Sequence, residues 1–99
     1  MVVVTARIVA KPESRAALAE AIAGLTAVSR QDKGCTSYIW YVDLEDPNAF
    51  STIETWETQD DIDAHMSADH TQAALAAAAD MVSEAPVIMQ YQVEKATQV

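Results

Sequence analysis

The hydrophobic period changes several times along this sequence, and the order of those changes most constrains the fold. Segments that are rich in β-branched and aromatic residues, or that alternate with a period of two, predict strands. These strands are expected at 2–10, 35–42, 49–57 and 87–94. Elsewhere apolar residues recur at spacings of three and four, which predicts helices over 12–31 and from 59 onward.

Residues that start or stop helices set the expected limits of the helical regions. Pro12 suits a first helical position. Thr58 with Asp61 three residues later is a capping-box-like pattern, so the second helical region should begin near residue 59. Ser67 is a suitable N-cap, which predicts a break there and a further helix over 68–83.

The resulting order of strand, helix, strand, strand, helix, strand is that of the ferredoxin-like α+β fold. This fold has a four-stranded antiparallel sheet with its helices on one face. The first strand is nonetheless apolar on both of its faces, since its odd and even positions are all apolar except Thr5 and Arg7. The second strand likewise has Trp40 on one face and Tyr41 on the other. A second copy of the sheet is the simplest cover for the remaining face. We therefore expect one domain over 1–99 that forms a homodimer.

Charge and cysteine content narrow the classes of partner. The net charge is −9, and no Lys or Arg occurs between Gly34 and Glu94, which argues against nucleic acid or anionic membranes as partners. Cys35 is the only cysteine and cannot form an internal disulfide, so a reducing compartment, the cytoplasm, is expected. Arg7 interrupts the apolar first residues, which we interpret as a strand and not as a signal peptide.

The sequence resembles the antibiotic biosynthesis monooxygenase family, also called the dimeric α+β barrel family. The matching segments are 6–12, 34–38, 41–50 and 54–58, together with Ala64, His65 and His70. The resemblance implies a homodimer whose sheets meet back to back, with a lipophilic cleft between sheet and helices in each subunit. Members include cofactor-free oxygenases of quinols and polyketide aromatics, heme-degrading enzymes and an isomerase of a phosphorylated dione.

The heme-degrading branch of that family can be compared position by position. An ungapped register through Trp56 places Arg7, His65 and Leu75 where that branch has an asparagine, a tryptophan and the iron-ligating histidine. Leucine cannot ligate iron, so heme chemistry is not expected unless His70 takes over that role. The same register implies that Arg7 and His65 lie in the cleft.

No cofactor is expected from the motifs. The sequence has no Gly-rich phosphate loop, no nucleophile elbow and no ligand spacing typical of a metal site. His65 and His70 are five residues apart, whereas a two-histidine metal site on one helix needs a spacing of three or four. We therefore predict neither flavin, nucleotide nor metal.

Three residues are the expected catalytic residues: His65, Arg7 and Tyr38. His65 should lie on the helix face that packs against the sheet, either as a packed core histidine or as a general base, because imidazole exchanges protons near neutral pH. Arg7 or Tyr38 would steady an oxyanion. Glu54 lies on a strand that should neighbour the first strand, so an ion pair between Arg7 and Glu54 is geometrically possible.

Further residues are expected to bind a substrate or to line the core. They are Trp56, Trp40, Glu54, Met66 and His70. Trp56 and Trp40 are either core residues or cleft walls that could flank a planar substrate. His70 is expected at the surface or as a capping partner, away from the face that carries His65.

These features predict a cofactor-independent monooxygenase that oxidises a small aromatic dihydroquinone or a polyketide-like phenol with O2. An electron-rich phenolate can give an electron to oxygen by itself, so the protein need only bind it, take its proton and exclude water. Two alternatives are a ligand-binding dimer without turnover and an isomerase of a small carbonyl compound. A phosphorylated substrate is disfavoured because its phosphate would depend almost entirely on Arg7.

Overall fold

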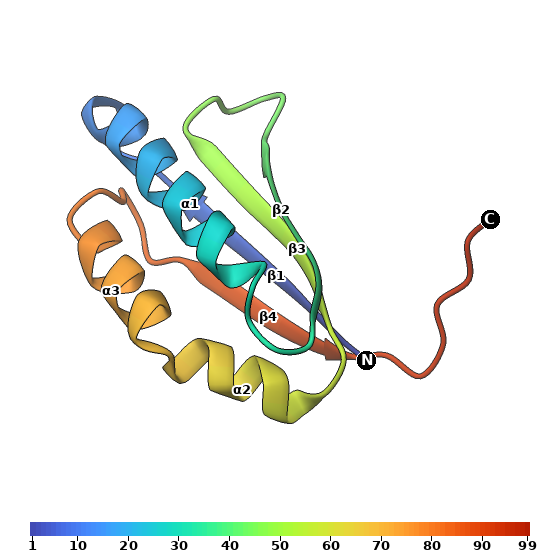
Figure 1. Ribbon diagram of the computed structural model, residues 1–99. Helices are drawn as coiled ribbons and strands as arrows, with labels where there is room; N and C mark the ends of the chain where they lie inside the picture. The colour runs from blue at the N-terminus through green and yellow to red at the C-terminus, as the bar shows by residue number, and fades with distance from the viewer.

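The computed structural model describes residues 1–99 as one sheet with all its helices on one face (Figure 1). In chain order the elements are β1 (Val2–Val9), the 3-10 turn η1 (Pro12–Ser14), α1 (Arg15–Ser29), β2 (Cys35–Val42), β3 (Ala49–Trp56), α2 (Gln59–Ser67), α3 (Asp69–Ala78) and β4 (Val87–Gln92). The strands lie in the order β2-β3-β1-β4, and each neighbouring pair is antiparallel. The predicted ferredoxin-like α+β fold is confirmed.

The expected start and break of the second helical region are confirmed, but its end is not. The Thr58 side chain accepts a hydrogen bond from the backbone N–H of Asp61, as the capping pattern predicts. Helix α2 stops at Ser67, yet the N-cap of α3 is Ala68, without a side-chain cap. Helix α3 ends at Ala78 and not at 83, because residues 81–83 pair instead with the end of β1 and with the two residues that follow it, Ala10 and Lys11.

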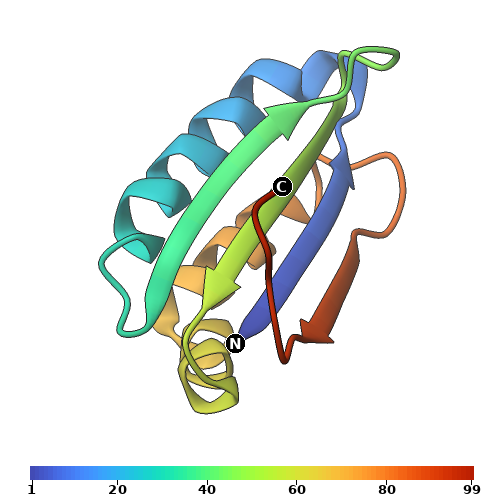
Figure 2. The ribbon, with the colours of Figure 1, turned by 90° about the vertical axis from the view of Figure 1, so that its right-hand side faces the viewer.

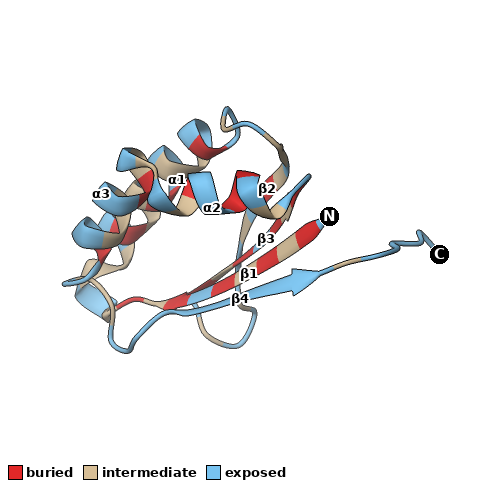
Figure 3. Ribbon diagram, turned by 90° about the horizontal axis from the view of Figure 1, so that it is seen from below, coloured by how far each residue is buried: buried red, intermediate tan, exposed pale blue.

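The two faces of the sheet differ in burial. Along β1 the residues Val2, Val4, Ala6 and Ile8 are buried beneath the helices and alternate with less buried residues on the opposite face. The alternating burial appears as bands of colour along β1 in Figure 3. That opposite face, seen toward the viewer in Figure 2, carries no helix. Its exposed apolar side chains come from β2, β3 and β4 and are Ile39, Tyr41, Ile53, Val87, Met89 and Tyr91.

The core between sheet and helices is divided into two clusters. One consists of Ile8, Ala10, Leu18, Ile22, Phe50 and Ala78, and the other of Val2, Val4, Tyr38, Trp56 and Ile62. Trp40 packs against both clusters. The region where the two clusters meet therefore lies on the helix-covered face of the sheet, beneath α1 and α3.

No helix in the structure has both the length and the apolar composition needed to cross a membrane.

Candidate active site

His65 is buried on α2 and packs against aromatic side chains of the sheet. Its side chain is 3% exposed, its ring lies 4.6 Å from that of Trp56 between centroids, and the edge of its ring meets Tyr38 at 5.9 Å. The cap at Thr58 and the fully buried Ile62 fix the start of α2 against the sheet. The prediction that His65 lies on the packed face of this helix is confirmed.

Asp32 joins the two histidines of the chain and was not predicted from the sequence. Its Oδ2 atom accepts a hydrogen bond of 2.7 Å from Nδ1 of His65 and another of 2.7 Å from Nε2 of His70. Asp32 lies in the turn between α1 and β2, where its polar neighbours are typical of a solvated loop. No sequence pattern connects this turn to a helix more than thirty residues later, so only the fold reveals the contact.

The expectation that His70 lies apart from His65 is wrong. The two rings are 5.9 Å apart, and the His70 side chain is only 29% exposed. The cause is Ala68, whose backbone is extended (φ −62°, ψ 147°) and separates α2 from α3. This break redirects the chain so that His70 reaches Asp32, and it brings the Thr71 hydroxyl to 3.4 Å from Nδ1 of His65.

A cavity of about 50 Å³ lies between the sheet and the helices and has His65 in its wall. Its polar lining residues are Tyr38, Trp40, Glu54, His65 and Thr71, and the others are apolar and include Met66. The structure thus brings together five of the predicted site residues, whereas Trp56 and His70 lie behind this wall. Trp56 supports the His65 ring, and His70 approaches the same histidine through Asp32.

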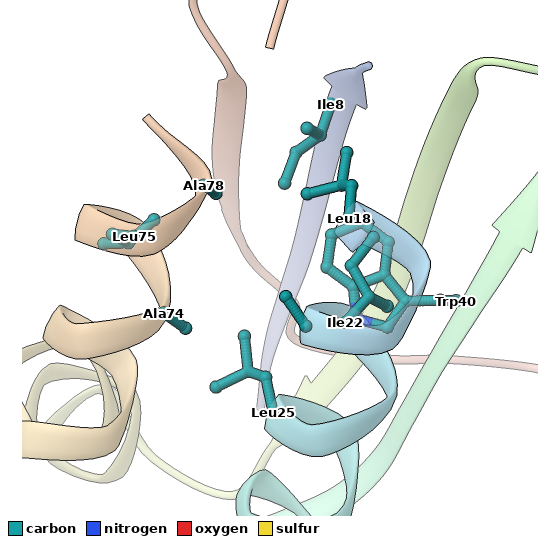
Figure 4. Close-up of a pocket in the computed structure, with 9 residues that line it drawn as sticks. Ile8, Leu18, Ile22, Leu25, Trp40, Ala74, Leu75 and Ala78 are labelled. Carbon is teal, nitrogen blue, oxygen red and sulfur yellow. The ribbon is translucent and has the colours of Figure 1, made fainter. Parts of the chain in front are cut away.

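An entirely apolar cavity of about 30 Å³ adjoins the first one (Figure 4). The two cavities share Ile8, Leu25, Trp40 and Leu75. Figure 4 shows its lining side chains coming from α1, α3 and the sheet. Both cavities suit water-sized molecules as they stand. An aromatic ring would therefore require the elements around Leu25 and Leu75 to move apart.

Glu54 is a buried carboxyl group without a cationic partner. It is 5% exposed, and its oxygens accept hydrogen bonds from Trp56 Nε1 (3.1 Å) and from the hydroxyl of Thr52 (3.0 Å). Burial raises the pKa of Glu54, and the two hydrogen bonds and the nearby His65 only partly oppose this shift. Glu54 therefore offers the cavity a carboxyl group that retains its proton to higher pH than an exposed one.

Tyr38 and Trp40 supply hydrogen-bond donors at the cavity wall. Burial, followed by the effect of Glu54, raises the pKa of Tyr38 to about 12, so its phenol stays protonated at neutral pH. The indole N–H of Trp40 is buried and has no hydrogen-bond partner. Buried donors without a partner are rare because an unmade hydrogen bond is costly, so a ligand oxygen at the Trp40 indole would relieve that cost.

Arg7 does not lie in the cleft, and that prediction is wrong. Ala6 and Ile8 face the helices, so the alternation of β1 directs Arg7 to the open face, where it is 44% exposed. It forms an ion pair of 3.1 Å with Asp43. The pair with Glu54, which the predicted strand order made geometrically possible, is also absent, because Glu54 lies opposite Val4 on the helix-covered face.

Fold and site together define a small α+β protein with an apolar cavity that ends at a buried histidine and a buried carboxyl group. The chain belongs to the antibiotic biosynthesis monooxygenase family, because the model of that family matches residues 1–77. None of the curated proteins matches the sequence.

Several solved structures share this fold. A protein from Deinococcus radiodurans superposes with a TM-score of 0.94 at 24% identity, covering 100% of this chain and 98% of that one. A protein from Pseudomonas aeruginosa gives 0.83 at 26% identity, with 93% of each chain covered. A third, named antibiotic biosynthesis monooxygenase, gives 0.89 at 23% identity and covers 96% of this chain and 100% of that one.

Proposed function

We propose that this protein is a cofactor-independent monooxygenase that oxidises a small aromatic dihydroquinone or a polyketide-like phenol with O2. The observation that carries the proposal is the position of His65. This buried imidazole lies in the wall of a largely apolar cavity, and its Nδ1 is committed to Asp32. Because Nδ1 donates to that carboxylate, Nε2 is the nitrogen that can accept a proton.

In the proposed reaction, Nε2 of His65 removes the proton of the substrate hydroxyl. The phenolate gives one electron to O2, and the ring radical and superoxide combine to form a C–O bond. The peroxide then takes the proton back from His65, and loss of water from the C(H)–OOH carbon leaves a carbonyl. A phenol and O2 thus become a quinone and water, and the substrate supplies all the electrons. Asp32 stabilises the histidine cation that forms in between.

Other cavity residues have supporting roles in this proposal. The protonated phenol of Tyr38 or the free indole N–H of Trp40 donates to the substrate oxyanion. Glu54 and Met66 line the cavity, and Trp56 holds the His65 ring from behind. Arg7 has no part, because it lies on the other face of the sheet.

The proposed enzyme acts as a homodimer joined through the open face of its sheet. That face exposes six large apolar side chains, several of them about half exposed. Exposed apolar patches of this extent mark association surfaces in soluble proteins. The helix-covered face, which holds the cavity, would then stay free for the substrate.

Oxygen uptake tests the role of His65. With a panel of dihydroquinones and phenols of graded acidity, His65→Ala should lower turnover of weakly acidic substrates by roughly 10²- to 10⁴-fold. Substrates that are already ionised should be spared, because they need no base. Thermal unfolding of the variant checks that the fold survives. An equal loss for acidic and weakly acidic substrates would contradict the role of base.

A ligand-binding dimer without turnover is the second candidate, and the packing of His65 against Trp56 and Tyr38 favours it, because a histidine packed in this way can be purely structural. Such a protein would bind aromatic phenols, as seen by quenching of its tryptophan fluorescence, yet consume no oxygen. An isomerase of a phosphorylated carbonyl compound has less support, because no Lys or Arg lines the cavity between the sheet and the helices.

A further inference from the structure

Nδ1 of His65, which the proposed reaction leaves hydrogen-bonded to Asp32, belongs to a cluster of three groups that could ligate a metal ion. Asp32, His65 and His70 each offer one ligand atom, and these atoms all lie within 4.8 Å of one another. They come from three different elements, namely the turn after α1, helix α2 and helix α3. We propose that these residues form a binding site for a divalent first-row transition metal ion such as Zn²⁺.

The donor set fits this class of metal. Two imidazole nitrogens and one carboxylate oxygen are typical ligands of Zn²⁺ and its neighbours, whereas Mg²⁺ and Ca²⁺ prefer oxygen alone. Ligands at about 2.0 to 2.2 Å from a tetrahedral ion lie roughly 3.4 Å from one another. The Asp32 oxygen is 2.7 Å from both nitrogens, so the carboxylate must withdraw by less than about 1 Å. The two nitrogens lie within 4.8 Å of each other and must adjust to about 3.4 Å as the ion enters.

Access and charge also favour a cation. A cavity of about 240 Å³ lies beside the cluster and is lined by Asp32, Lys33, Asp60, Asp61, Ala64 and His65. Three carboxylates thus face one ammonium group, and the Lys33 side chain is 92% exposed. Asp60 and Ala64 are exposed as well, so the cavity reaches solvent. An acidic approach of this kind raises the local concentration of cations.

A tetrahedral Zn²⁺ ion with three protein ligands keeps its fourth coordination position for a water molecule. Metal bound at Nδ1 would leave the proton of the neutral His65 ring on Nε2. In that state Nε2 cannot accept a proton from a substrate. If the proposed function holds, metal binding and the role of base therefore exclude each other, and the ion is an inhibitor. The metal site itself does not depend on that function.

Cobalt(II) provides the main test, because a four-coordinate Co²⁺ ion absorbs visible light. The experiment uses untagged protein, since tag histidines bind metal, after dialysis against a chelator. Co²⁺ should saturate the visible absorption at one ion per chain, and Zn²⁺ should displace it. His70→Asn and Asp32→Asn should each weaken binding more than about 100-fold, because losing even an outer partner of a ligand costs roughly 10- to 100-fold.

Two matched variants control for charge and for the thiol. Asp80→Asn removes the same charge at an exposed position beyond the far end of α3, and Cys35→Ser removes the only thiol. Both should bind Co²⁺ like the parent protein. Binding that survives His70→Asn and Asp32→Asn, or that disappears in Cys35→Ser, would overturn the assignment.

A measurement on the unchanged protein keeps the test decisive if a variant fails to fold. The chain has only two histidines, so its imidazole NMR signals are easily assigned. Substoichiometric Co²⁺ should broaden the ring signals of both His65 and His70, and added Zn²⁺ should shift both. Signals that remain sharp at equimolar Co²⁺ would show that no such site exists.

Discussion

The buried carboxyl group of Glu54 gives this protein a pH dependence that a single substitution should remove. Burial raises the pKa of Glu54 above its ordinary value of 4.5 in the folded chain. Between that value and the raised one, the folded state keeps a proton that the unfolded state has released. The stabilisation from this proton is fully present below pH 4.5 and is lost as the pH rises through the folded pKa.

The size of the effect follows from linkage. Each pH unit within this window lowers the free energy of unfolding by about 1.4 kcal/mol. Glu54→Gln has nearly the same shape and no charge, so it lacks this slope. In this variant an amide NH2 group replaces one of the two carboxyl oxygens, so either the Thr52 hydroxyl or the Trp56 indole N–H loses its acceptor. The loss costs about 1 to 3 kcal/mol at every pH. The stability of the variant relative to the parent should therefore rise with pH and then level off.

Urea unfolding at a series of pH values measures this difference, with tryptophan fluorescence as the signal. Protein concentration must be held constant, because association would shift the apparent stability. Glu57→Gln is the matched control, since Glu57 is exposed and its loss removes the same charge. A Glu54→Gln difference that stays constant with pH, or one that the Glu57 variant reproduces, would refute a raised pKa at Glu54.

Two further predictions concern the backbone and the open face. Gly34→Ala should destabilise the fold by about 1 to 3 kcal/mol in urea unfolding, because Gly34 has φ +81° and a Cβ there would collide with the Asp61 carboxylate. Gly24→Ala, where a Cβ meets nothing within 4 Å, should be neutral or stabilising, and equal losses in both would contradict this account. Ile53→Asp on the open face should convert a dimer into monomers in sedimentation velocity, whereas Leu44→Asp in the exposed loop should not. A folded parent that is already monomeric at micromolar concentration would exclude the dimer.

The fold was predictable because it depends on periodicity, which is a local property of the sequence. The period-two alternation over 49–57 predicted a strand, and the structure buries Phe50, Thr52, Glu54 and Trp56 on one face of β3. The cap at Thr58 was equally local and is confirmed. The end of α3 was not predictable, because residues 81–83 exchange helical hydrogen bonds for bonds to a strand distant in sequence.

Arg7 shows how a correct fold can accompany a wrong site. The resemblance placed this residue in the cleft through an ungapped register, but the parity of β1 decides its face. Ala6 and Ile8 are both buried beneath the helices, so the residue between them must point away. In a strand that is apolar at both parities, the sequence alone does not indicate which parity the helices cover.

The cluster around His65 was missed because irregular backbone assembles it. In a continuous helix, residues five apart point about 140° away from each other, which is why His65 and His70 were assigned to different faces. The extended backbone of Ala68 removes that constraint, although no side chain caps the new helix there. Asp32 reaches both rings from a turn that continues into Gly34, where positive φ lets the chain pass close to Asp61. A turn, a glycine and a helix break thus bring together three residues that regular periodicity would keep apart.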